Sequence, residues 1–163
     1  MKKSRCLFCE ISKKNKEFIE FENEHFYVVF DRFPVSPGHA LIIPKRHVVS
    51  VLELNQKEQK AFWKVLKKTI QLIEKKDLKK LYESFITNPL NEKSEWFCRK
   101  MLKHEKLGKK PDGYNIGLNE GEAAGRTIHH LHIHVIPRYS GDVKDPTGGI
   151  RNIIPKLGNY KQK

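Results

Sequence analysis

The segment "HHLHIHVIPRY", residues 129–139, places four of the chain's eight histidines within six positions. Three of them, His130, His132 and His134, alternate with apolar residues. Alternate residues of a strand point to the same face, about 6.6 to 7 Å apart. The segment therefore predicts a strand over 130–138 with three imidazoles on one face and an apolar face toward the core.

Three imidazoles side by side need partners, because a buried polar nitrogen without a hydrogen bond is costly. One interpretation is a polar seam in which backbone carbonyls satisfy the rings. A second is a metal site, since alternate strand residues can reach one zinc ion. A third is a nucleophilic imidazole that its neighbours orient. The strand alone leaves all three open.

The length and composition predict a single globular domain over 1–163. The chain has 163 residues, of which 38% are hydrophobic and 31% charged, enough for an apolar core without disulfide bonds. No run approaches the roughly 18 apolar residues that cross a bilayer. The positive N-terminus has no apolar stretch behind it, as a signal peptide would have. We therefore expect a cytoplasmic protein that does not associate with membranes.

The formal charge of +13 raises nucleic acid as a partner, because clustered cations bind phosphate with release of counterions. Most of the charge, however, comes from lysines that are scattered over the whole chain. This distribution favours a solvated basic surface, so nucleic acid is possible as a partner but not favoured.

Apolar runs between glycine, proline and polar turns predict short strands. These runs are 18–30, which a polar turn divides in two, and 38–47, 114–121 and 130–138. Asn55 and Glu58 form a predicted capping box, and apolar residues follow at helical spacing over 56–75. The pattern predicts an α+β fold in which an antiparallel sheet of about five strands packs against one main amphipathic helix.

Two segments lie outside this predicted core of about 6–140. The lysine-rich insertion 77–112 predicts one more short helix with Trp96, Phe97, Met101 and Leu102 inward and Cys98 as a small buried residue. Its lysines fit a solvated excursion, a lid over a site or a contact with a polyanion. The tail 141–163 predicts an ordered loop and a short extended piece, in which Arg151 either meets distal phosphates or belongs to a capping turn.

The three cysteines, Cys6, Cys9 and Cys98, are an odd number and predict no disulfide framework. In a cytosolic chain, Cys6 and Cys9 at this spacing indicate half of a metal site or a redox pair.

The glycine-rich turn "NEGEAAGRT" directly precedes the histidine strand, and such turns offer backbone N–H groups to phosphate. With this turn, the chain closely resembles the histidine triad (HIT) family of nucleotide hydrolases and transferases. The resemblance covers nearly all of 6–140 except the insertion. It rests on the triad 130–136, Asn119, Gly121, Gly125 and Thr127 before it, Pro137 and Arg138 after it, Asp31 and His39 in "VVFDRFPVSPGHALIIPKRHV", and "CLFC" near the start.

The resemblance implies roles for individual residues. His132 would attack an α-phosphate and form a nucleotidyl-histidine intermediate that water hydrolyses, with His134 and His39 assisting. Nucleotide binding would involve Asp31 at the ribose, together with Asn119, Gly125, Arg126, Thr127 and His134. Cys6, Cys9, His47 and His130 would hold a structural zinc ion, and no organic cofactor is expected.

The implied substrate is a nucleoside polyphosphate, such as diadenosine tetraphosphate, or a phosphoramidate. The alternatives are a nucleotidyl transferase, a nucleotide-binding protein with little turnover, and catalytic zinc at the three histidines. The family usually pairs two chains through the helix and an edge strand, so a homodimer is expected. Arg126 replaces the glutamine that many members have, and a cation there would favour substrates with additional phosphates.

Overall fold

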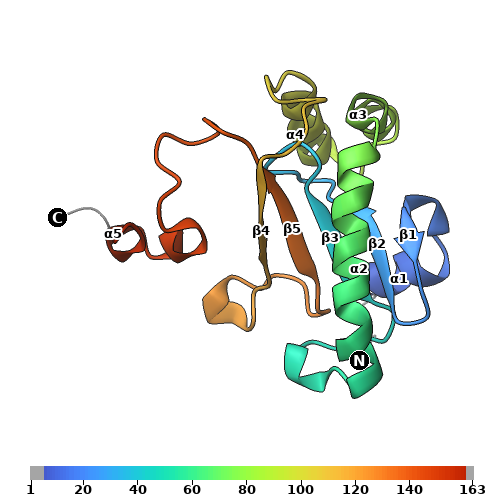
Figure 1. Ribbon diagram of the computed structural model, residues 1–163. Coiled ribbons are helices and arrows are strands. Elements are labelled where there is room, and N and C mark those ends of the chain that lie inside the picture. Colours follow the sequence, from blue (N-terminus) through green and yellow to red (C-terminus); the bar gives the residue numbers. More distant parts are fainter. Residues whose placement is uncertain (1–5, 161–163) are drawn as a thin grey trace.

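The computed structural model describes residues 6–160, apart from the side chains of 155 and 156. Its sheet has five strands in the antiparallel order β1-β2-β3-β5-β4 (Figure 1). The strands are β1 (Phe21–Glu22), β2 (Phe26–Phe30), β3 (Ala40–Pro44), β4 (Gly113–Gly117) and β5 (Ile133–Arg138). The helices are α1 (Leu7–Lys13), α2 (Gln56–Lys75), α3 (Leu78–Thr87), α4 (Glu92–Leu102) and α5 (Pro155–Gly158). This arrangement confirms the predicted α+β class.

The helix α2 covers one face of the sheet and lies in front of it in Figure 1. Val65 and Ile73 of α2 pack against Val28, Ile42 and Val135 of the three central strands. The predicted capping box is present at its start. The Asn55 side chain accepts from the backbone N–H of Glu58 at 3.0 Å, and the Glu58 carboxylate accepts from that of Asn55 at 2.8 Å.

The opposite face of the sheet is covered in part by α1. Phe8 and Ile11 of this helix pack against Val29, Leu41 and other inward residues of β2 and β3. Because strand neighbours alternate between faces, the same two strands supply both apolar layers, and all five residues of each are buried.

The triad segment joins the sheet later than predicted. β5 begins at Ile133 and pairs with β3 in a register that places His134 opposite Leu41. The backbone N–H of Leu131 donates instead to the carbonyl of Val48 at 2.7 Å. The chain at His130 and His132 therefore follows the loop after β3 and enters the ladder only at Ile133.

The insertion forms two helices: the predicted helix is present as α4, and α3, which was not predicted, precedes it. Asp77 and Asn91 each cap a helix with their side chains, which divides the segment. Met101 and Cys98 are buried as expected, but Trp96 is 55% exposed. Cys98 and Met101 are three residues apart and share one face of α4, whereas Trp96 lies on the solvent side.

The tail contains a 3₁₀ helix, Gly149–Ile153, and α5, so the predicted extended piece was wrong. Gly148 has a φ of 91° and turns the chain so that it approaches the carbonyl of Gly158. Arg151 donates to the carbonyl of Leu157 at 3.4 Å and lies over the ring of Tyr160, within the tail itself. No helix among the described residues is long and apolar enough to cross a membrane.

Candidate active site and metal centre

A cavity of about 370 Å³ lies on the sheet face that α1 partly covers. Its polar lining comes from widely separated parts of the chain, and the rest is mostly apolar. The polar or charged residues that line it are Asn15, Asp31, Arg32, Thr127, His132 and His134, and its apolar residues include Leu7, Phe8, Ile11, Phe18, Phe33, Phe85 and Leu90. Two of the three triad histidines therefore open onto one enclosed space.

His132 has its ring oriented by the backbone. Its Nδ1 lies 2.8 Å from the carbonyl oxygen of His130. A carbonyl only accepts, so Nδ1 carries the proton and Nε2 holds a free lone pair in the neutral ring. The ring also contacts Phe8, at a centroid distance of 5.2 Å. This geometry gives His132 one unprotonated nitrogen that is suitable for nucleophilic attack.

Asp31, His39 and His134 form a line of polar contacts beside the cavity. The Asp31 Oδ2 lies 3.5 Å from Nδ1 of His39, and Nε2 of His39 lies 3.0 Å from Nδ1 of His134. Asp31 directly follows β2 and His39 directly precedes β3, so the β2–β3 connection brings them together. Nδ1 of His39 also lies 3.5 Å from the backbone N–H of Val35. In the tautomer that has the His39 proton toward the Asp31 carboxylate, Nδ1 of His134 donates to His39 and leaves Nε2 of His134 as an acceptor.

Burial keeps these two imidazoles neutral. It lowers the pKa of His134 to about 4, and the neighbouring His39 and His132 rings act in the same direction. Burial also lowers the pKa of His39, against the opposing effect of Asp31. At neutral pH both rings are therefore uncharged, and each has one nitrogen that donates a hydrogen bond and one that accepts a hydrogen bond.

The glycine-rich turn is built on two residues with positive φ, Gly121 at 92° and Gly125 at 91°. Asn119 donates from its side chain to the carbonyl of Gly125 at 3.3 Å and so holds the turn. Thr127, directly after the turn, lines the cavity. The turn is thus present where the sequence predicted it, and the hydrogen bond from Asn119 stabilises its conformation.

Arg126 contacts other parts of the protein, whereas its position in the sequence suggested a contact with the phosphates of the substrate. Its guanidinium donates to the carbonyl of Val49 at 3.2 Å and lies 3.5 Å from the Glu120 carboxylate. The residues that line the cavity do not include Arg126. In this structure its charge ties the glycine-rich turn to the loop after β3.

A second cluster brings together Cys6, Cys9, His47 and His130, whose ligand atoms all lie within 4.8 Å of one another. His130 is fully buried, and its Nε2 donates to the carbonyl of Pro44 at 2.8 Å. Its Nδ1 therefore holds the lone pair and lies 3.3 Å from the sulfur of Cys6 and 3.6 Å from that of Cys9. Two sulfurs and two imidazoles are a donor set typical of tetrahedral zinc, and these residues fit that ion.

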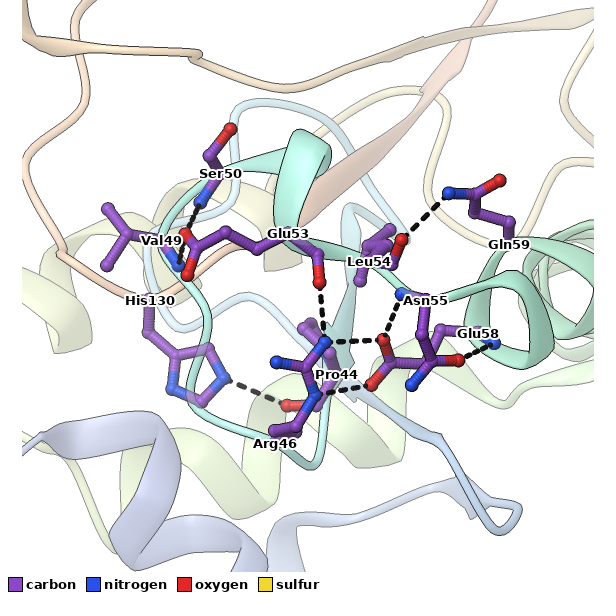
Figure 2. A network of polar contacts seen from close by, with 10 residues as sticks. All are labelled: Pro44, Arg46, Val49, Ser50, Glu53, Leu54, Asn55, Glu58, Gln59 and His130. Carbon is purple, nitrogen blue, oxygen red and sulfur yellow. Dashed lines mark hydrogen bonds and ion pairs between the residues drawn. The ribbon is translucent and has the colours of Figure 1, made fainter.

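A polar network anchors the loop that holds this cluster (Figure 2). Arg46 makes two contacts with the Glu58 carboxylate, at 3.0 and 2.7 Å, and a third with the carbonyl of Glu53. Glu58 is also the residue whose carboxylate completes the capping box of α2. The loop with Pro44 and His47 is therefore fixed to the first turn of α2.

The sequence alone missed two groups of residues that shape the site. Arg46 was not singled out, because its pairing with Glu58 depends on how the loop folds back onto α2. Phe85 and Leu90 of the insertion line the cavity. Their apolar character is visible in the sequence, but their position against the site depends on tertiary packing.

A sequence profile of the HIT domain matches residues 12–141. The chain belongs to the HIT family. An uncharacterized HIT-like protein of Mycoplasma genitalium is 32% identical over 137 residues, which cover 83% of this chain and 74% of that protein. An AP-4-A phosphorylase of Mycobacterium tuberculosis is 29% identical over 134 residues, which cover 80% of this chain but only 52% of that enzyme.

A solved structure resembles this HIT chain as well. It is a Zn-bound histidine triad family protein from Mycobacterium smegmatis, with a TM-score of 0.53 and 26% identity over 86% of this chain and 79% of that one. The family resemblance drawn from the triad is thus confirmed. In this HIT chain the triad divides between two clusters, with His132 and His134 at the cavity and His130 beside the cysteines.

Proposed function

We propose that this HIT protein is a nucleotidyl hydrolase that acts on the α-phosphate of a nucleoside polyphosphate or phosphoramidate. The observation behind the proposal is the orientation of His132, whose Nδ1–H donates to the His130 carbonyl while its Nε2 remains free. A neutral imidazole held in this way beside a cavity is prepared for attack on phosphorus.

In the first step, Nε2 of His132 bonds to the α-phosphorus and the bond to the leaving group breaks. The leaving oxygen or nitrogen departs with the electron pair and takes up a proton from solvent, and the proton removed from the attacking water in the second step returns to solvent. The ring gains positive charge, which the carbonyl of His130 stabilises through the Nδ1–H bond. In the second step, water attacks phosphorus, the P–N bond breaks and the electron pair returns to His132.

His134 serves the second step as a general base. Its Nε2 is the acceptor that remains when Nδ1 donates to His39. The proton that His134 removes from water places charge on the ring, and the line through His39 to Asp31 stabilises this charge. Asp31 lines the cavity and has lone pairs left for the ribose hydroxyls.

The phosphate groups bind at the glycine-rich turn. The hydroxyl of Thr127, which lines the cavity, supplies a donor there. The backbone N–H groups of Ala124, Gly125 and Arg126 already donate to carbonyls within the turn, so the sequence-based expectation that they bind phosphate does not hold for them. Asn119 and Arg126 hold the turn in shape, through the carbonyls of Gly125 and Val49.

We further propose that Cys6, Cys9, His47 and His130 hold structural zinc. When bound, the ion supplies a rigid link between α1 and the triad and takes no part in the reaction.

As in the family, two cytoplasmic chains would pair through α2 and the edge strand β4. Trp63 of α2 is 69% exposed and would be covered in such a pair. Light scattering that gives a monomer mass would contradict the pairing.

The main test follows AMP released from diadenosine tetraphosphate and from adenosine 5′-phosphoramidate. His132→Asn should lower kcat by at least about 10³-fold on both, with the AMP affinity kept. His129 is exposed and absent from the cavity lining, so His129→Ala is the matched control and should retain activity. Acid-labile label on the protein, from substrate labelled at the α-phosphate, should appear only with His132 present. Turnover retained in His132→Asn would contradict the assignment.

A second candidate function is phosphorolysis, which the AP-4-A phosphorylase among the relatives favours. Inorganic phosphate would then attack the nucleotidyl-histidine in place of water and give ADP instead of AMP. Adding phosphate to the same assay distinguishes the two, because ADP from the labelled nucleotide indicates transfer. Nucleotide binding without either product would instead indicate a protein of the HIT fold with little turnover.

A further inference from the structure

The insertion supplies part of the cavity wall. Phe85, in the last turns of α3, and Leu90, in the link to α4, line the cavity together with Phe18 and Phe33. Neither Phe85 nor Leu90 belongs to the sheet or to the triad segment. The apolar end of the cavity is thus built in part by residues that have no role in the proposed chemistry.

Arg32 fastens α3 in this position. Its guanidinium donates to the carbonyl of Phe85 at 3.3 Å and to that of Asn88. These carbonyls lie at the C-terminal end of α3, where the helix leaves acceptors unpaired and favours a cation. The guanidinium carbon also lies 4.0 Å from the centre of the Phe85 ring. The contacts hold both the backbone and the ring of Phe85.

The second helix of the insertion is fastened to the same short segment. The ring of Phe97 meets that of Phe33 edge to face, at 6.0 Å. The thiol of Cys98, which is buried, lies 3.9 Å from the carbonyl of Arg32. Both helices therefore dock on residues 32 and 33, directly after Asp31.

We infer that Phe85 and Leu90 determine which nucleobase the site accepts, by contact area and stacking against the aromatic wall. The inference rests on the proposed function. Arg32 uses its Nη2 for the carbonyls of α3, while its Nε is buried without a partner among the described residues. Most of the other lining residues are apolar, so contact area dominates and an adenine is favoured over a cytosine by its larger stacking surface.

The test compares kcat/KM for adenosine and cytidine 5′-phosphoramidates, which share one leaving group. Phe85→Ala and Leu90→Ala should each lower kcat/KM for adenosine by about tenfold and for cytidine by clearly less. Phe85→Leu, which keeps more of the apolar wall, should lie between the wild type and Phe85→Ala. Trp96→Ala is the matched control, because Trp96 is an exposed aromatic residue of α4 and not among the lining residues.

Equal losses for both bases, or no loss, in the two alanine variants would overturn the inference. Thermal unfolding of each variant separates loss of the wall from loss of the fold, and Phe85→Leu keeps the test valid if Phe85→Ala does not fold. Calorimetric binding of AMP and CMP separates the two proposals. If the wild type binds AMP more tightly than CMP and Phe85→Ala abolishes this preference, the role of Phe85 in base selection is supported even if no substrate is hydrolysed. Equal affinities of the wild type for AMP and CMP would overturn that role.

Discussion

Equal spacing along the chain does not make the three triad histidines equivalent. His130 directs Nδ1 at two sulfurs, His132 directs Nδ1 at a carbonyl, and His134 directs Nδ1 at another imidazole. In each case the partner of one ring nitrogen decides what the other nitrogen can do. The interpretation as one cage of three histidines does not describe this arrangement, because His130 shares its cluster of ligand atoms with Cys6 and His47.

The lowered pKa of His134 has a consequence for stability. The folded ring has a pKa of about 4 against an ordinary value of 6.5, so the unfolded chain binds more protons between these values. The free energy of unfolding should therefore fall as the pH is lowered from about 6.5 to 4. Urea unfolding at pH 7 and pH 5 should show a drop of roughly 1 kcal/mol from this group, allowing for solvent screening.

The matched variant for this pH effect is His134→Gln, which has no titrating group at that position. Its drop between pH 7 and pH 5 should be smaller than that of the wild type. A variant that loses as much stability as the wild type over this interval would show that His134 is not responsible.

Arg126 should influence the shape of the turn more than the choice of substrate. Arg126→Gln loses the contact with the Val49 carbonyl and the ion pair with Glu120, which should cost about 1 kcal/mol of stability. The ratio of kcat/KM on a polyphosphate to kcat/KM on a phosphoramidate should change by less than about twofold, because Arg126 does not line the cavity. A twofold change in this ratio corresponds to less than about 0.5 kcal/mol. A larger change in this ratio would indicate that the Arg126 guanidinium contacts the phosphates of the substrate.

At the scale of secondary structure, α2 joins the core to the loop of the Cys/His cluster through its first turn. Glu58 completes the capping box and also receives Arg46 from the loop that carries His47. Its side chain is only 4% exposed, so removal of the carboxylate leaves the Arg46 guanidinium and the backbone N–H of Asn55 without this partner.

Glu58→Ala should lower the free energy of unfolding by about 2 to 4 kcal/mol, measured by urea unfolding. The same variant should also weaken zinc binding in a competition with a chromophoric chelator, because the loop with His47 loses its anchor. The control is Glu95→Ala in α4, which removes an (i, i+4) pair with Arg99 and should cost less than about 0.5 kcal/mol.

How far the sequence predicted these elements depends on how local their causes are. The helix over 56–75 was predicted with its observed bounds, because Asn55, Glu58 and the apolar periodicity all lie within it. The start of β5 was misplaced, because the contact of Leu131 with Val48 joins distant segments. The Phe85 wall and the Arg46 contact also depend on long-range packing, so no pattern in the sequence identifies them.

For the whole molecule, the metal cluster joins parts that are far apart in the chain. Cys6 and Cys9 flank the start of α1, His47 follows β3 and His130 precedes β5. Zinc bound at these ligands only in the folded protein should stabilise it by about 2.7 kcal/mol at a concentration 100 times its Kd. Thermal unfolding with zinc and with chelator should show this difference.

Cys9→Ser should remove most of the zinc effect on unfolding, while Cys98→Ala should keep it, since Cys98 lies in α4 and outside the cluster. Elemental analysis should give one zinc ion per chain for Cys98→Ala and less for Cys9→Ser. A zinc effect of equal size in the two variants would contradict the ligand assignment.

Phe85 and Leu90 place part of the cavity wall on the insertion, outside the sheet. The proposed reacting groups belong to the sheet and the segments that enter it, whereas part of the wall belongs to α3 and the link after it. Other residues of 77–112 are part of the main core, and the Tyr82 hydroxyl accepts from the backbone N–H of Gly38, beside His39. If Phe85 and Leu90 select the base as inferred, substitutions at these two positions should change ligand preference while the core contacts of the insertion are kept.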